Sequence, residues 1–141
     1  MDNLVETVAA RGHEHVAATH ASTFEVTTDD WLTPAGDCIV GVEADRAPAE
    51  FDPAFVAACR DAAREVTVVL RADGHEARVG ARGHPDLTFA SDRSLVVRTS
   101  DYVDDRTVAV GADAAAADLD RSLVRALADG AALTVRLRVE C

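Results

Sequence analysis

The sequence predicts an α+β fold in a single domain over residues 1–141, with a mostly antiparallel or mixed β-sheet and two main helices. Three observations predict it. The chain of 141 residues is long enough to bury about 68% of the surface that its unfolded form exposes, which suffices for one core. Segments with strand-like alternation outnumber helical ones, and the two helical segments are too far apart for a doubly wound parallel sheet. No internal repeat or linker is evident.

Strands are expected in the first third of the chain. Apolar side chains and His20 recur with a period of two over residues 16–28, which predicts a long strand with one side toward the core. Residues 4–11 are its expected partner. A further strand is expected over 37–43, because a turn-like segment precedes it and its apolar residues alternate.

The first helix is expected to begin at Pro53. Asp52 can cap it, and proline suits the first helical position because it has no N–H to satisfy. Phe55 and Cys59 then contribute to an apolar stripe at helical spacing.

A hairpin is expected around Asp73-Gly74, since this dipeptide favours a type I′ turn. A two-residue loop also fixes the register of the two strands. The predicted pairs are Ala72 with His75, Arg71 with Glu76, Leu70 with Ala77, Val68 with Val79 and Val66 with Ala81.

The last third of the chain predicts short strands over 95–98 and 106–111, followed by a second helix over 114–129. Asp113 is its expected cap, because it precedes the alanine run and the leucines spaced by four. Apolar and polar residues alternate over 133–139, which predicts a half-buried final strand.

The charge composition predicts a habitat. The formal net charge is -11, and all 14 basic residues are arginine. Large negative charge keeps proteins hydrated where salt screens charge, so we expect a haloarchaeal, cytoplasmic protein. A GC-rich genome without salt adaptation is the alternative. The absence of a basic stripe disfavours nucleic acid as a partner, although a small arginine patch can hide in an acidic background.

Membrane and metal partners are not predicted. No apolar run of 18 residues exists, and the N-terminus lacks the layout of a signal peptide. Cys38, Cys59 and Cys141 form no CxxC pair, so neither a disulfide framework nor a common zinc motif is expected. His13 and His15 have the alternate spacing of a ligand pair, which is a weak signal for a metal. The sequence does not identify a cofactor.

Several polar residues at strand ends and turns are candidates for a site. Pro85 stiffens the turn that holds His84, although a hydrogen-bonded Asx turn at Asp86 explains the same residues. Arg106 shares parity with inward-facing residues, so it needs either a structural partner, which could be Asp37, Asp86 or Asp104, or an anionic ligand. A buried neutral histidine that is hydrogen-bonded to a backbone carbonyl, to Thr19 or to Thr23 explains His20.

Several motifs in order resemble an uncharacterised archaeal family, domain of unknown function 371. The resemblance covers nearly the whole chain and implies a stand-alone archaeal domain without an assigned activity, substrate or cofactor. The motifs that carry it are Arg11-Gly12-His13-Glu14, Leu32-Thr33-Pro34, Gly36-Asp37-Cys38-Ile39-Val40-Gly41, Gly83-His84-Pro85-Asp86-Leu87-Thr88, Ser100-Asp101, Asp105-Arg106-Thr107, and Ala112-Asp113 with Asp118-Leu119.

Two hypotheses of function follow. In the first, one cleft binds a small anionic metabolite, or hydrolyses it or transfers a group from it. Its expected catalytic residues are His13, His84 and Asp86, and its expected ligand-binding residues are Glu14, Asp37 and Arg106. In the second, the same residues form a buried polar network, and the protein is a non-catalytic interaction module, for example a homo-oligomer.

Overall fold

The computed structural model describes residues 4–140, and its first sheet is antiparallel throughout. The strand order is β1-β8-β4-β5. The strands are β1 (Leu4–Arg11), β8 (Ala132–Val139), β4 (Glu65–Ala72) and β5 (His75–Arg82). Of the three neighbouring pairs in this sheet, only β4 and β5 are consecutive in sequence and joined by a hairpin, and β1 pairs with the last strand.

The second sheet has mixed strand directions. Its order is β3-β2-β6-β7, with an antiparallel centre and a parallel pair at each edge. The strands are β3 (Ile39–Gly41), β2 (Thr23–Thr27), β6 (Ser94–Arg98) and β7 (Thr107–Ala109). The expected α+β class with antiparallel and mixed strands is therefore confirmed.

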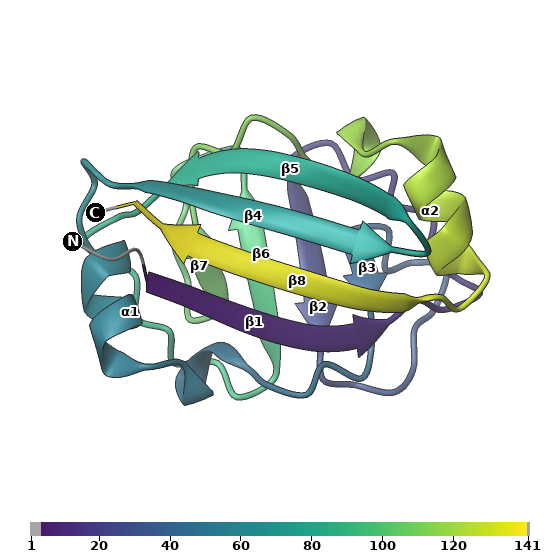
Figure 1. The fold of residues 1–141 in the computed structure, drawn as a ribbon, viewed down its shortest axis with the longest axis horizontal. Helices are drawn as coiled ribbons and strands as arrows, with labels where there is room; N and C mark the ends of the chain where they lie inside the picture. Colours follow the sequence, from purple (N-terminus) through teal and green to yellow (C-terminus); the bar gives the residue numbers. More distant parts are fainter. Residues whose placement is uncertain (1–3, 141) are drawn as a thin grey trace.

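The two sheets face each other across the core. Figure 1 shows the strands of the second sheet behind the first and crossing them steeply. Isolated bridges join the sheets at both edges, from Arg11 to Val42 and from Arg82 to Val110. The buried faces meet in one apolar cluster, whose largest side chains include Phe24, Phe55, Leu70, Leu87, Leu95, Leu123, Leu133 and Leu137.

Helix α1 (Pro53–Cys59) begins as expected. The Asp52 carboxylate accepts a hydrogen bond from Ala54 N at 2.8 Å, and Pro53 occupies the first turn. A single 3-10 turn, η1 (Pro48–Glu50), precedes it.

The prediction of one helix over 114–129 is wrong for the first part of this segment. A 3-10 turn, η2 (Ala116–Asp118), comes first, and α2 (Arg121–Ala128) begins after a break. Asp120 caps α2 through Ser122 N at 2.7 Å. Asp113 accepts instead from Gly80 N at 3.1 Å, which ties β5 to the segment after β7. No helix among residues 4–140 is long and apolar enough to span a membrane.

The hairpin between β4 and β5 is confirmed in every predicted pair. Asp73 and Gly74 have φ of 50° and 78°, as a type I′ turn requires. The local chemistry of one dipeptide thus sets the register of two eight-residue strands.

The expected strand over 16–28 is shorter than predicted, because only β2 is extended. Ala18 has φ of 50°, which breaks the alternation, and β2 pairs with β6 rather than with residues 4–11. His20 precedes β2, and its Nδ1 accepts a hydrogen bond from Thr23 N at 3.1 Å, so the expected bond to Thr23 is confirmed.

The prediction that the chain has no internal repeat is also wrong, because the fold consists of two similar halves. Each half runs strand, strand, strand, 3-10 turn, helix, strand, so β1–β4 with α1 correspond to β5–β8 with α2. Arg11-Gly12-His13 follows β1 as Arg82-Gly83-His84 follows β5. Identical residues also recur elsewhere, such as Asp52 with Asp120 and Arg71 with Arg138, but the connection between the second and third strands differs in length between the halves, so the repeat has no constant spacing in the sequence.

Equivalent long-range hydrogen bonds recur in both halves. They tie each first strand to the segment that follows the third strand of its own half. The equivalent pairs are Arg11 with Val42 and Arg82 with Val110 through both backbone bonds, and Ala9 with Asp45 and Gly80 with Asp113 through the aspartate side chain.

A pseudo-two-fold axis relates the halves. Exchange of β1 with β5 and of β4 with β8 leaves the strand order of the first sheet unchanged, so the axis passes between β8 and β4. The halves also interlock at two glycines. A Cβ on Gly12 would collide with the backbone of Leu127 in α2, and one on Gly83 with the carbonyl of Cys59 at the end of α1.

Candidate functional site

The outward face of the first sheet is open. Both helices lie at the ends of this sheet and leave its outward side uncovered among the residues that the structure describes (Figure 1). In β8 the residues that point inward, such as Leu137, are buried, whereas their neighbours in the outward row are exposed or partly exposed. This alternation is what a strand with one face on the core requires.

Four arginines gather on this face in a chain of net charge -11. Arg136 and Arg78 both lie opposite Val69, one on each side of β4. Their Cα atoms are therefore about 10 Å apart, two strand spacings. Arg71 and Arg138 lie on the same face, opposite Thr134 and Thr67 respectively. We call Arg71, Arg78, Arg136 and Arg138 the arginine cluster.

Two members of the arginine cluster have an acidic partner. Arg71 Nε lies 2.7 Å from a Glu76 carboxylate oxygen, and an Arg138 terminal nitrogen lies 3.1 Å from Glu140. Arg78 and Arg136 form no ion pair with residues 4–140. The cluster thus keeps positive charge that the described carboxylates do not neutralise.

One nitrogen of the cluster is buried without a partner. Arg138 Nε is inaccessible to solvent and forms no hydrogen bond among the described residues. A buried donor that lacks an acceptor costs stability, on the order of 1–3 kcal/mol. Because solvent does not reach this nitrogen, an acceptor from a ligand would reach it only after a movement of the Arg138 side chain.

Two adjoining pockets lie within the cluster. The first has a volume of about 50 Å³, and the second has about 190 Å³. They share Val69, Arg71 and Arg136. The remaining lining residues are Thr67, Arg78 and Arg138 in the first pocket, and Thr7 and Thr134 in the second.

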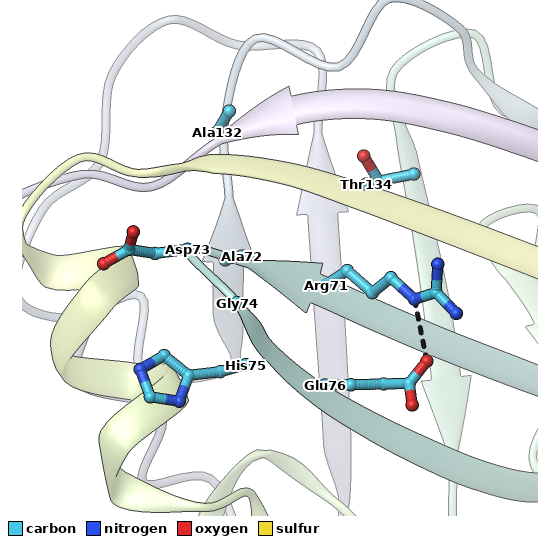
Figure 2. A pocket seen from close by; sticks show the side chains of 8 residues that line it. All are labelled: Arg71, Ala72, Asp73, Gly74, His75, Glu76, Ala132 and Thr134. Atoms are coloured by element: carbon cyan, nitrogen blue, oxygen red, sulfur yellow. Dashed lines mark hydrogen bonds and ion pairs between the residues drawn. The ribbon is translucent and has the colours of Figure 1, made fainter.

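A larger, open pocket of about 440 Å³ lies beside them at the β4–β5 turn. Figure 2 shows Arg71 and Glu76 along its edge, joined by their ion pair, with Thr134 on the neighbouring strand. Asp73 and Glu76 line this pocket as well, so its charge is mixed. Negative charge is therefore better accommodated in the two pockets of the arginine cluster.

The chemistry of this face is that of binding. Guanidinium groups donate hydrogen bonds in a fork that matches phosphate and carboxylate, and threonine hydroxyls add further donors. The two pockets contain no carboxylate, histidine or cysteine that could act as a base or nucleophile. No group of three or more metal-ligating side chains occurs in the part of the chain that the structure describes.

Arg106, a predicted ligand-binding residue, lies in a different place, beside the second sheet. The prediction that it points inward is wrong, because its side chain is 47% exposed. It pairs with Asp104 at 3.2 Å and with Glu25 at 3.5 Å. The pairing with Asp104 was one of the structural alternatives.

Asp37, another predicted ligand-binding residue, has a structural role through its backbone. Its carbonyl accepts hydrogen bonds from the N–H groups of residues 19 and 20, which fixes the entry to β3.

Asp104 is the centre of an ion-pair network with these residues. It also pairs with Arg98 at 3.0 Å and accepts a hydrogen bond from the Thr107 hydroxyl at 2.9 Å. Burial raises the pKa of Asp104, but hydrogen bonds from Thr107 and Arg106 outweigh burial and bring the pKa down to about 2.

Cys38 lies beside this network. Its thiol donates to Glu25 at 3.6 Å, and burial together with the Glu25 charge raises its pKa to about 11. The thiol is therefore protonated at neutral pH and a poor nucleophile.

The predicted catalytic histidines lie at opposite ends of the molecule. His13 follows β1 where Gly12 packs on α2, and the backbone N–H of His84 bonds to the carbonyl of Cys59 in α1 (Figure 1). The structure does not bring them together. Glu14 is exposed beside His13.

Both histidines form the same turn. Nδ1 of His13 accepts from His15 N at 3.0 Å, and Nδ1 of His84 accepts from Asp86 N at 3.0 Å. This bond requires an unprotonated Nδ1, and it fixes the ring as an Asx-like turn would. Any catalytic role of His13, His84 or Asp86 stays a prediction.

Sequence reasoning missed the arginine cluster because its members come from three strands. A signal was present, since Arg136 and Arg138 alternate with inward residues and must share one face. The pairing of β8 with β4, which lies far away in the sequence, was needed to place Arg71 beside them.

Comparison with known proteins agrees with the resemblance of the sequence motifs. A family described as "Domain of unknown function (DUF371)" matches residues 8–140. The uncharacterised protein MJ0206 of Methanocaldococcus jannaschii is 34% identical over 132 residues, which cover 94% of this chain and 97% of that protein.

Proposed function

Since the chain belongs to the DUF371 family, whose description states no activity, we propose from the geometry alone that the protein binds a small anionic metabolite at the arginine cluster. The observation that carries this proposal is the uncompensated charge of Arg78 and Arg136, which line one pocket together with Arg138. A phosphate or carboxylate group would supply the missing negative charge.

The cost of the cluster supports a functional role. At a separation equal to that of the Cα atoms, about 10 Å, like charges repel by about 0.4 kcal/mol in water and by about 1.7 kcal/mol at the effective dielectric of a protein surface. Neutral side chains at positions 78 and 136 would remove this repulsion. Functional sites are often less stable than the fold would allow.

The size and lining of the pockets favour a small molecule over nucleic acid. Volumes of about 50 and 190 Å³ are of the order of one anionic group and a short attached chain. No aromatic side chain lines either pocket, so bases would find no stacking surface there.

Thermal denaturation tests the proposal. Inorganic phosphate at low millimolar concentration should raise the Tm of the wild type more than chloride does at equal ionic strength, because the general salting-out effect of phosphate is small at that concentration and a bound ligand stabilises the fold. Arg136→Gln should abolish this extra increase, whereas Arg125→Gln, an exposed arginine on α2, should keep it. Equal Tm curves in phosphate and chloride for the wild type would refute anion binding.

A second candidate function is a non-catalytic interaction module. The observation that favours it is the network of Asp104 with Arg98 and Arg106, which gives these polar residues structural partners. In this proposal the open sheet face docks on the acidic surface of a second copy. Sedimentation analysis tests it, because a dimer should form in the wild type and dissociate in Arg136→Gln.

A further inference from the structure

The two pockets of the arginine cluster are equivalent under the pseudo-two-fold axis. The axis exchanges β4 with β8 and β1 with β5, so each residue that lines the second pocket has a counterpart in the first. Arg71 lines both pockets, whereas its counterpart Arg138 lines only the first. The counterparts are Arg71 and Arg138, Thr134 and Thr67, Val69 and Arg136, and Thr7 and Arg78.

Each pocket is therefore a half-site of the same design. Arg71 lies opposite Thr134 across the β4–β8 ladder, and Arg138 lies opposite Thr67 on the other side of the axis. A guanidinium and a hydroxyl on neighbouring strands are a suitable pair of donors for one phosphate group. Arg136 lies next to the axis and lines both half-sites.

We propose that the ligand is a molecule with two phosphate groups, one bound in each half-site. This inference rests on the proposed anion binding at the same cluster and adds the class of ligand. Arg71 and Arg138 come from different halves of the chain, so the repeat itself brings two anion sites to one sheet face. A single molecule that bridges them gains from the high effective concentration of its second group.

The spacing of the half-sites selects an extended molecule. Arg138 lies four residues from Thr134, the partner of Arg71, so the two arginine Cα atoms are about 14 Å apart. The half-sites share three lining residues, so the bound groups lie closer than these Cα atoms. Two phosphates joined by a chain of several atoms fit this spacing, as in a hexose bisphosphate, whereas the adjacent phosphates of pyrophosphate are too close.

The half-sites differ in charge. Arg78 lines one, and its counterpart in the other is the neutral Thr7. The half-site with Arg78 and Arg138 therefore binds a single phosphate group more tightly, and the half-site of Arg71 takes the second group.

Calorimetric titration with fructose 6-phosphate and fructose 1,6-bisphosphate at constant ionic strength tests this inference. The bisphosphate should bind with one molecule per chain and roughly 100-fold more tightly than the monophosphate. Arg71→Gln should weaken the bisphosphate more than the monophosphate, because Arg71 lines both half-sites whereas the half-site that takes the monophosphate also contains Arg78 and Arg138. Arg138→Gln should weaken both ligands, and Arg125→Gln should weaken neither.

The outcomes separate the two proposals. If the monophosphate and the bisphosphate bind with equal affinity, or if two bisphosphate molecules bind per chain, the proposal of a bridging ligand is overturned. Anion binding at the arginine cluster would remain intact. If neither sugar phosphate nor inorganic phosphate binds, the proposed function itself fails. Circular dichroism of each variant shows whether a loss of binding reflects a loss of folding.

Discussion

Arg136→Gln should make the protein more stable in the absence of a ligand. The change removes a charge that has no carboxylate partner among residues 4–140, on a residue whose Cα atom lies about 10 Å from that of Arg78 across β4. The Coulomb energy of this pair lies between about 0.4 and 1.7 kcal/mol, depending on the effective dielectric. Glutamine keeps most of the length of the side chain. We expect a gain of about 0.5 kcal/mol, or an increase in Tm of about 1–2 °C.

Urea denaturation measures this gain, first at the lowest KCl concentration at which the wild type is folded and then in 2 M KCl. The Debye screening length shortens to about 3 Å at molar salt, so the gain in stability should vanish in 2 M KCl. Arg125→Gln is the matched control. It removes the same charge from an acidic protein outside the cluster, so it should leave stability unchanged or slightly lower. If Arg136→Gln destabilises the protein as much as the control does, the cluster is not repulsive and the argument for a bound anion loses its basis.

Three further predictions concern the fold. The Tm should rise with KCl up to molar concentrations, because screening relieves repulsion in a chain of net charge -11; a flat or falling Tm would contradict adaptation to salt. Gly74→Val should lower the free energy of unfolding by more than ~1 kcal/mol in urea denaturation, because φ is 78° at this position, although a Cβ would meet no atom within 4 Å. Gly12→Ala should lower the free energy of unfolding several times as much, because its Cβ would collide with α2. Asp104 has a pKa of about 2 when folded, below its ordinary value of 3.8, so it stabilises the fold above pH 4 and that stability is lost as the pH falls toward 2. Asp104→Asn should flatten this part of the acid denaturation curve, and an unchanged curve would contradict the network with Thr107 and Arg106.

Local chemistry in the sequence determined several elements of this protein. Asp73-Gly74 specified a type I′ turn, and through it the register of β4 and β5, because a two-residue loop permits only one pairing. Asp52 and Pro53 likewise specified the start of α1, since capping involves only neighbouring backbone groups. The α+β class followed from the number and spacing of such segments.

The tertiary structure decided the features that depend on distant residues. The pairing of β1 with β8 joins residues 4–11 to the end of the chain, and no local signal specifies such a partner. Arg106 is a second example. It shares parity with buried residues in the sequence but is half-exposed, because ion pairs with Asp104 and Glu25 determine its position.

The candidate site shows the same division. Alternation in the sequence determined that Arg136 and Arg138 lie on one face of a strand. Only the folded chain, with β4 and β5 paired beside β8, brought Arg71 and Arg78 to the same face and made four separate cations into one cluster. A sequence specifies which side of a strand a residue occupies, whereas its neighbours across the sheet depend on long-range pairing, and a binding site needs both.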